Sequence, residues 1–154
     1  QDTMHFIHDR SNQGDTVEIE NGAVFSIRSC DTGIVSQWQK QHNIRIKPNH
    51  TWFSSYQYSI YNQNTNTAAE ARLSMGPFLN SPYTRRIVQI SPAASTIVLD
   101  NNSVWKISDT QALMKWQVND KVILGDNPGW FTWGYDSIVI NVTTDNYLTA
   151  QRAY

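Results

Sequence analysis

The sequence predicts an all-β protein made of two tandem, duplicated small β-barrels of the Src-homology-3-like or OB-like kind, packed with pseudo-two-fold symmetry. Three observations predict this fold class: a long internal repeat, short stretches rich in β-branched residues, and turn residues at matching places in each half. With 154 residues and 40% hydrophobic residues, the chain can fold as one ordinary domain or two very small ones. A single fused sandwich is the alternative architecture.

The repeat appears when residues 15–28 are aligned with residues 95–108, at an offset of 80. Residues 31–53 then align with residues 109–131 at an offset of 78, after a two-residue change in loop length. Large aromatic residues stay in register while small polar residues drift, which indicates a duplication. The identities in the second block are Asp31, Thr32, Trp38, Gln39, Asn49, Trp52 and Phe53, which match Asp109, Thr110, Trp116, Gln117, Asn127, Trp130 and Phe131.

The boundary between the halves is predicted where Gly76, Pro77 and Pro82 interrupt the chain, because glycine and proline are strong breakers of regular structure. We therefore expect a first barrel over residues 1–76, a linker over residues 77–82 and a second barrel over residues 83–154.

Each half is expected to open with a strand, over residues 4–8 and 85–90, and to continue into a hairpin. Asn21-Gly22 predicts a type I′ turn, because both residues tolerate positive φ, and residues 100–103 repeat this signal more weakly. A capping box at residues 108–111 predicts one helical turn in the second half. The first half has Gly33 there, which predicts a loop. The remaining strands are expected over residues 43–47, 58–62 and 68–73, and over residues 121–125, 137–141 and 147–152.

Three segments of the second half form the pattern S-V-W-x-I, W-x-x-x-D-x-V and I-x-I-N, at residues 103–107, 116–122 and 138–141. This pattern resembles uncharacterised small β-domain proteins of intracellular bacteria. The first half departs from it at Ala23 and His42, where the second half has Ser103 and Asp120. The resemblance implies a small β-domain and carries no assigned activity.

Composition argues against several classes of function. Charged residues are 16% of the chain and the net charge is −1, so the basic surface of a nucleic-acid-binding protein is not expected. No apolar run approaches the ~18 residues of a membrane-spanning helix. The start at Gln1 and the wealth of Asn, Gln, Ser and Thr predict an extracytoplasmic protein, periplasmic or secreted, after removal of a signal peptide. A trimmed cytosolic chain is the alternative.

Residues with catalytic or metal-binding chemistry are few and scattered. Cys30 is the single cysteine, which excludes an intrachain disulfide, and we expect it to be a small buried residue. His5 and His8 are three apart on a predicted strand and point to opposite faces, so they cannot share a metal ion. No metal, cofactor or catalytic residue is predicted. A hydrolase remains the alternative. Its candidates are Cys30 paired with His42 or His50, or a carboxylate pair among Asp109, Asp120 and Asp126.

The candidate binding residues are aromatic side chains in two matching loops. The pair Trp52-Phe53 matches Trp130-Phe131, and this match predicts that both pairs fold back and plug the open ends of the barrels. Tyr135 matches Tyr56, and the matching pair Trp38 and Trp116 is also predicted to pack inside. The candidates are Trp133, Tyr135, Trp130, Phe131, Trp52 and Phe53.

Trp133 has no aromatic counterpart, because the first half has Ser54 and Ser55 in this part of the loop. A tryptophan that the shared fold does not require predicts a contact with a partner, although packing against the other barrel or against Phe78 is the alternative. The sequence therefore predicts a non-enzymatic extracytoplasmic binding module for a protein or carbohydrate, using the loop aromatics of the second repeat. The alternative is a hydrolase acting on a polysaccharide or a peptide.

Overall fold

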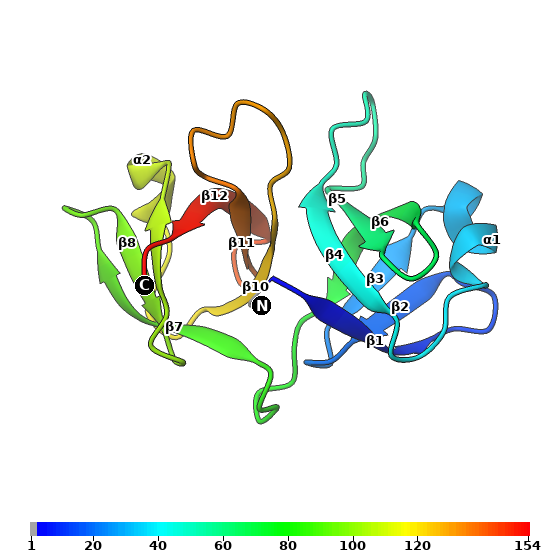
Figure 1. Ribbon diagram of the computed structural model, residues 1–154. Coiled ribbons are helices and arrows are strands. Elements are labelled where there is room, and N and C mark those ends of the chain that lie inside the picture. Colours follow the sequence, from blue (N-terminus) through cyan, green and yellow to red (C-terminus); the bar gives the residue numbers. More distant parts are fainter. Residues whose placement is uncertain (1–2) are drawn as a thin grey trace. The chain divides into compact units, whose positions relative to one another are not determined.

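The computed structural model describes residues 3–154 and shows an all-β chain with two closed barrels (Figure 1). The chain divides into two compact units between Tyr83 and Thr84. The expected tandem pair of small barrels is thus confirmed, while their packing about a pseudo-two-fold axis stays a prediction. Gln1 and Asp2, with which the first expected domain begins, lie outside the described residues. Within the expected linker, the Phe78 N–H donates to the Asn21 carbonyl at 2.9 Å.

The first barrel closes six antiparallel strands in the order β1-β2-β3-β6-β5-β4, with β4 pairing back to β1. A short 3-10 helix and one turn of α-helix join β3 to β4. The elements are β1 (His5–Arg10), β2 (Thr16–Ile19), β3 (Val24–Ile27), η1 (Ser29–Asp31), α1 (Thr32–Val35), β4 (Asn43–Pro48), β5 (Tyr58–Asn62) and β6 (Thr67–Met75).

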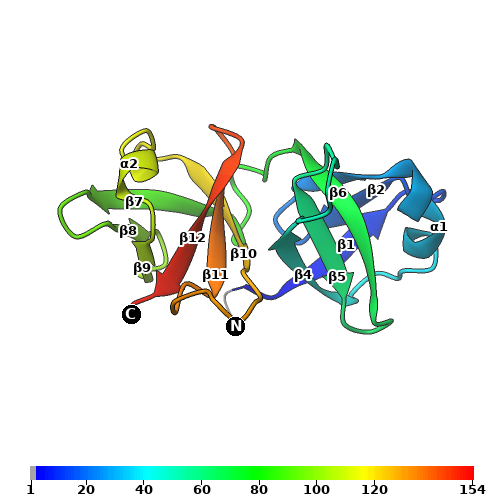
Figure 2. The same cartoon turned by 90° about the horizontal axis from the view of Figure 1, so that it is seen from above.

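The second barrel repeats this topology strand for strand, in the order β7-β8-β9-β12-β11-β10. Even the irregularity in the first hairpin recurs, between Ile7 and Asp9 in one barrel and between Ile87 and Gln89 in the other. Figure 2 shows α1 and α2 each at an end of its own barrel. The elements are β7 (Arg85–Ser91), β8 (Thr96–Leu99), β9 (Val104–Ile107), α2 (Thr110–Leu113), β10 (Lys121–Asp126), β11 (Ser137–Asn141) and β12 (Asn146–Arg152).

Strand periodicity explains how each barrel acquires a core. Alternate residues of β2, β3, β8 and β9 are buried, as expected for strands with one face toward a barrel interior. Trp38 and Trp116 are 0% and 4% exposed, which confirms that they pack inside. Their indole N–H groups donate to Thr67 and Asn146, so the polar edge of each ring is satisfied.

The two cores differ at several matched positions, and two of these changes are linked. Phe25 in the first barrel is replaced by Trp105 in the second, and Ala23 by Ser103. The Trp105 indole N–H donates to the Ser103 hydroxyl at 3.0 Å, so the serine supplies the acceptor that the larger ring requires.

The predicted type I′ turn at Asn21-Gly22 is wrong. Gly22 has φ of +89°, but Asn21 is not among the residues with positive φ, and the Gly22 N–H donates to the Ile19 carbonyl at 3.0 Å. This is a type I turn followed by a left-handed residue, the geometry of a three-residue hairpin loop. The second barrel repeats it, with Asn102 at φ of +68°. The Asn21 side chain accepts from the Ala23 N–H at 2.9 Å, and this bond supports the longer loop.

The helix expectations need two corrections. The first half also forms a helical turn, α1, in which the Ser36 N–H donates to the Thr32 carbonyl at 2.9 Å; glycine lowers helix propensity by about 1 kcal/mol, which does not prevent one turn at Gly33. In the second half the N-cap is Asp109, whose carboxylate accepts from the Ala112 N–H at 3.0 Å, whereas Ser108 pairs with Thr149. Asp31 occupies the N-cap position of α1, but its side chain makes no capping bond and instead accepts from the Glu70 N–H at 2.9 Å.

Cys30 is exposed, so the expectation of a buried thiol is wrong. It lies in η1, which has no buried residue because this short helix follows the end of β3 and leaves the barrel wall. His5 is buried and His8 is exposed, as their spacing on β1 predicted.

Candidate functional site

Two long loops carry the candidate binding residues. Residues 49–57 join β4 to β5 in the first barrel, and residues 127–136 join β10 to β11 in the second. Figure 1 shows that each loop projects beyond the strands of its own barrel. We call residues 51–55 the first tip and residues 129–134 the second tip.

The tip aromatics are exposed, so the prediction that they plug the barrels is wrong. Trp52 and Phe53 are 84% and 99% exposed in the first tip. In the second tip Trp130, Phe131 and Trp133 are 95%, 82% and 86% exposed. Trp133 does not fill the interior of its own barrel, and its contact with a partner stays a prediction.

Strand residues fill the barrel interior that the tips were expected to fill. Phe25 and Tyr58 are fully buried and pack edge to face in the first barrel, with ring centroids 6.2 Å apart. The second barrel has Trp105 and Ser137 at these two positions, so a larger ring accompanies the smaller strand residue. With the interior occupied, the loops extend outward.

The base of each loop is closed by the same asparagine. The Asn49 N–H donates to the Gln57 carbonyl at 2.9 Å, and its side-chain amide donates to the Tyr56 carbonyl at 2.8 Å. Asn127 makes the two equivalent bonds, to Asp136 at 2.8 Å and to the Tyr135 carbonyl at 2.7 Å. We call Asn49 and Asn127 the loop clamps. Their identity was visible in the sequence repeat, but no role followed from sequence reasoning.

The first loop has a second support, provided by Glu70 on β6. The carboxylate accepts from the Ser54 hydroxyl at 2.6 Å and from the Asn49 amide at 2.8 Å, and it forms an ion pair with Arg28. The hydrogen bond from Ser54 is the main reason why the pKa of Glu70 is lowered, with Asn49 and Arg28 acting in the same direction and burial opposing them. The first loop is therefore tied to its barrel by an ionised group.

The second loop is shaped by its backbone. Trp133 and Gly134 both have positive φ, at +54° and +86°, and the Tyr135 N–H donates to the Thr132 carbonyl at 2.8 Å. Phe53 in the first tip also has positive φ, at +61°. The left-handed region costs a non-glycine residue about 1–2 kcal/mol. Both tips thus hold a bulky aromatic residue in a conformation that a bare turn would give to glycine or asparagine.

Tyr135 differs from the other candidates, because it is half-buried at the loop base. Its counterpart Tyr56 is also half-buried, and the Arg72 guanidinium lies 5.7 Å from its ring centroid. The structure therefore separates five exposed tip aromatics from a tyrosine that belongs to the loop base.

The residues considered for hydrolysis have structural partners. Nδ1 of His42 accepts from the Gln39 N–H at 3.2 Å and from the Asn62 amide at 3.0 Å. Asp120 accepts from the equivalent donors, Gln117 and Asn141, at 2.9 and 2.8 Å. His42 and Asp120 thus perform the same structural task in the two barrels.

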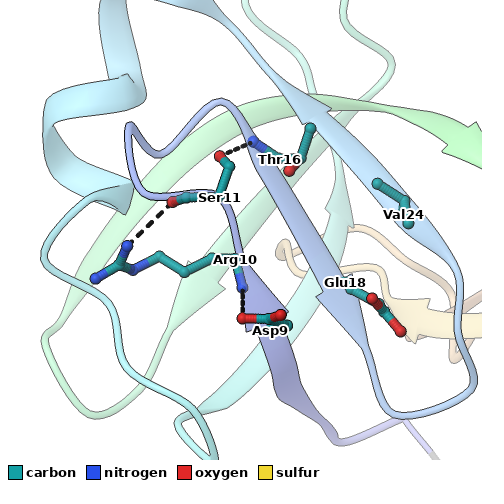
Figure 3. A pocket seen from close by; sticks show the side chains of 6 residues that line it. All are labelled: Asp9, Arg10, Ser11, Thr16, Glu18 and Val24. Atoms are coloured by element: carbon teal, nitrogen blue, oxygen red, sulfur yellow. Dashed lines mark hydrogen bonds between the residues drawn. The ribbon is translucent and has the colours of Figure 1, made fainter.

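A shallow polar pocket lies over β1 and β2 of the first barrel (Figure 3). Asp9 and Glu18 face each other across the strand pair. The Asp9 side chain is 55% exposed, whereas an acid that holds a proton for catalysis relies on burial. The Arg10 guanidinium donates to the Trp38 carbonyl at 2.6 Å and to the Ser11 carbonyl at 3.0 Å, so it supports the backbone.

Among residues 3–154, no three His, Cys, Asp or Glu side chains gather in a way that would hold a metal ion. In the same part of the chain, no helix combines the length and apolarity needed to cross a membrane. Comparisons with protein-family models, curated protein sequences and solved structures find no match to this chain.

Proposed function

We propose that the protein is a non-enzymatic binding module that makes contact through the aromatic tip of each barrel. The observation that carries this proposal is the exposure of five large aromatic side chains, each more than four-fifths exposed. Each such ring buries about 150–250 Å² when it packs, so leaving it in water forgoes a large hydrophobic gain. Clustered exposed apolar rings are typical of contact surfaces.

The second tip contributes more than the first, because it presents three aromatic rings where the first presents two. Trp133 is the additional ring; its backbone is left-handed and its side chain is 86% exposed. The proposal therefore keeps Trp130, Phe131 and Trp133 at the centre of the contact surface, with Trp52 and Phe53 as a second contact point.

An apolar partner suits this surface better than a carbohydrate. Sugar binding combines an aromatic platform with polar side chains that bond the hydroxyl groups. Here the Asn49 and Ser54 side chains turn inward to Glu70, and the Asn127 side chain turns inward to the Tyr135 carbonyl. The protein partner expected from the sequence is therefore favoured over the carbohydrate.

We further propose an extracytoplasmic, secreted bacterial protein. The support is a composition rich in Asn, Gln, Ser and Thr, together with the resemblance to small β-domain proteins of intracellular bacteria.

The test compares immobilised wild-type protein with Trp133→Ala against a panel of extracellular proteins and a glycan array. We expect Trp133→Ala to keep the wild-type melting temperature and to weaken capture of a protein partner by roughly thirty-fold. Met114→Ala is the matched control, since Met114 is 62% exposed on a different part of the second barrel. Equal capture by all three proteins, or unfolding of Trp133→Ala, contradicts the proposal.

A further inference from the structure

The two tips share their apolarity but not their shape. The first loop is one residue shorter than the second, has two aromatic rings instead of three, and lacks the Pro128-Gly129 pair. Their left-handed residues also fall at different places, Phe53 in one tip and Trp133 with Gly134 in the other. A rigid protein groove would require a defined shape from each tip, whereas a fluid apolar medium requires only exposed apolar rings.

The tips contain no Asp, Glu, Lys, Arg or His. Residues 51–57 and residues 127–135 lack all five residue types, and the flanking His50, Asp126 and Asp136 lie at or near the loop bases. Moving a charged group into a medium of low dielectric constant is costly, so a charge-free tip can leave water without that penalty.

The residue types at the tips are those that prefer the boundary between lipid headgroups and acyl chains. Tryptophan combines a large apolar ring with one N–H donor, which suits a site that is apolar on one side and hydrated on the other. Phenylalanine adds apolar area of the kind found on interfacial surfaces. Trp52 with Phe53, and Trp130 with Phe131 and Trp133, supply this combination in both tips.

From these three properties we infer that the tips insert into the interfacial region of a lipid bilayer with zwitterionic headgroups, so that the protein binds membranes peripherally. This inference rests on the proposed function, because it concerns the same aromatic tips, and it gives them a lipid bilayer as their partner in place of the protein favoured there. Attraction to anionic lipid is not part of it: the net charge is −1, and Asp126 and Asp136 flank the second tip.

Each barrel carries a tip of its own, so the chain has two separate insertion points. Each inserted tip transfers its own apolar rings out of water and adds to the binding free energy. Removing one tip should therefore weaken membrane binding strongly, and removing both should abolish it.

The experiment measures flotation of the full chain with phosphatidylcholine vesicles, together with tryptophan fluorescence. Three of the six tryptophans lie at the tips and are exposed, while Trp38, Trp105 and Trp116 are buried. Insertion should shift the emission to shorter wavelength, and phosphatidylcholine brominated on its acyl chains should quench it. This quenching needs no variant, so it tests the inference in the wild-type protein.

The variants identify the inserting residues. W130A/W133A should reduce the apparent affinity for vesicles roughly thirty-fold or more, as expected when anchoring aromatics lose their contact. W52A/F53A should reduce it less, and the combined variant should not float. Trp133→Phe should retain most of the affinity, and Met114→Ala all of it. Circular dichroism and the melting temperature check that each variant is folded.

Four outcomes overturn the inference. Flotation that the tip variants leave unchanged overturns both the inference and the proposed function. Binding that requires anionic phosphatidylserine and disappears in 1 M salt (roughly a 3 Å Debye length) shows electrostatic adsorption instead. Flotation without quenching by the brominated lipid places the tips outside the acyl region. Absence of flotation, combined with capture of a purified protein that W130A/W133A abolishes, removes the membrane and leaves the proposed function standing.

Discussion

The loops at residues 49–57 and 127–136 occupy the same place in their barrels but are supported by different chemistry. Both are closed by a clamp, Asn49 in one and Asn127 in the other. The first loop is then tied by the ionised Glu70, whereas the second barrel has Thr149 at that position, and Thr149 pairs with Ser108. The bonds that hold the two loop bases differ, whereas both loops expose aromatic side chains at their tips. The exposed apolar tip is therefore the feature that the two loops share.

The same relation holds elsewhere in the barrels. The His5–Glu20 pair, at 2.7 Å, joins β1 to the end of β2, and Arg85–Asp100, at 3.1 Å, does so in the second barrel. The two barrels thus use different residue types at these two matched positions, but in both barrels the side chains at the two positions are bonded to each other. A residue without a counterpart in the other half is therefore not by itself a sign of function, and Trp133 belongs to the contact surface because of its exposure.

The largest expected effect separates buried from exposed tryptophans. Trp116→Ala should lower the free energy of unfolding by about 3–5 kcal/mol, because it leaves a cavity in the second core. Trp130→Ala should change it by less than about 0.5 kcal/mol, because its ring is in water. Trp38→Ala and Trp52→Ala should give the same contrast in the first barrel. Urea unfolding, monitored by circular dichroism, measures the free energy of unfolding of all four variants. A loss of several kcal/mol in Trp130→Ala would show that the Trp130 ring packs inside the barrel.

The second effect separates the clamps. Asn49→Ala removes a bond to the Tyr56 carbonyl and also one of the donors to Glu70, so we expect a loss of about 2–3 kcal/mol. Asn127→Ala removes the bond to the Tyr135 carbonyl and should cost about 1 kcal/mol. Urea unfolding gives both values. Hydrogen exchange at the backbone amides of residues 49 and 127, which donate to the Gln57 and Asp136 carbonyls, reports local opening of the loop bases. Equal losses would mean that Glu70 adds nothing to the first loop.

Sequence periodicity and the repeat predicted the two barrels and their strands, because alternating β-branched residues and turn residues are local signals. The tips were misread for a physical reason. Tryptophan recurs at matching positions, such as Trp52 and Trp130, whether its ring is buried in the barrel or exposed for contact with a partner. The sequence match alone does not distinguish the two. Deciding between them requires knowing that Phe25 and Tyr58 already fill the first barrel, which depends on contacts between distant strands.

Cys30 and Asn49 illustrate two further limits. The exposure of Cys30 follows from where β3 ends, and strand ends are the least certain part of a sequence prediction. Asn49 was visibly shared by both halves, but its clamp bond reaches the Tyr56 carbonyl seven residues away. Every residue has a backbone carbonyl, so the sequence does not indicate which carbonyl Asn49 bonds. The role of Asn49 at the loop base is therefore seen only in the folded structure.

A third, smaller effect concerns pH. The pKa of Glu70 is lowered in the folded protein, so its stabilising contribution is complete above the ordinary carboxyl pKa and is lost as the pH falls through the lowered value. The interaction is partly screened by water, and we expect Glu70 to account for less than about 1 kcal/mol. Unfolding free energies at neutral pH and in acid, for wild type and Glu70→Gln, measure it. A pH dependence as steep in Glu70→Gln as in wild type would exclude Glu70 as its source.

The smallest expected effect comes from an exchange between the repeats. Nδ1 of His42 lies 3.2 Å from the Gln39 N–H nitrogen and 3.0 Å from the Asn62 amide nitrogen, and both of these groups are donors. A carboxylate at Asp120 accepts from the equivalent pair in the second barrel. His42→Asp should therefore keep both bonds and change the free energy of unfolding by no more than about 0.5 kcal/mol.

His42→Ala is the control for this exchange, because it leaves the same two donors without an acceptor and should cost about 1–3 kcal/mol. Urea unfolding of the two variants side by side makes the comparison. If His42→Asp is as unstable as His42→Ala, the two positions are not equivalent and the imidazole has a task of its own. If both variants are as stable as wild type, water satisfies the donors of Gln39 and Asn62. Only a stable aspartate variant beside an unstable alanine variant supports the view that the two barrels exchange residue types while preserving the bonds.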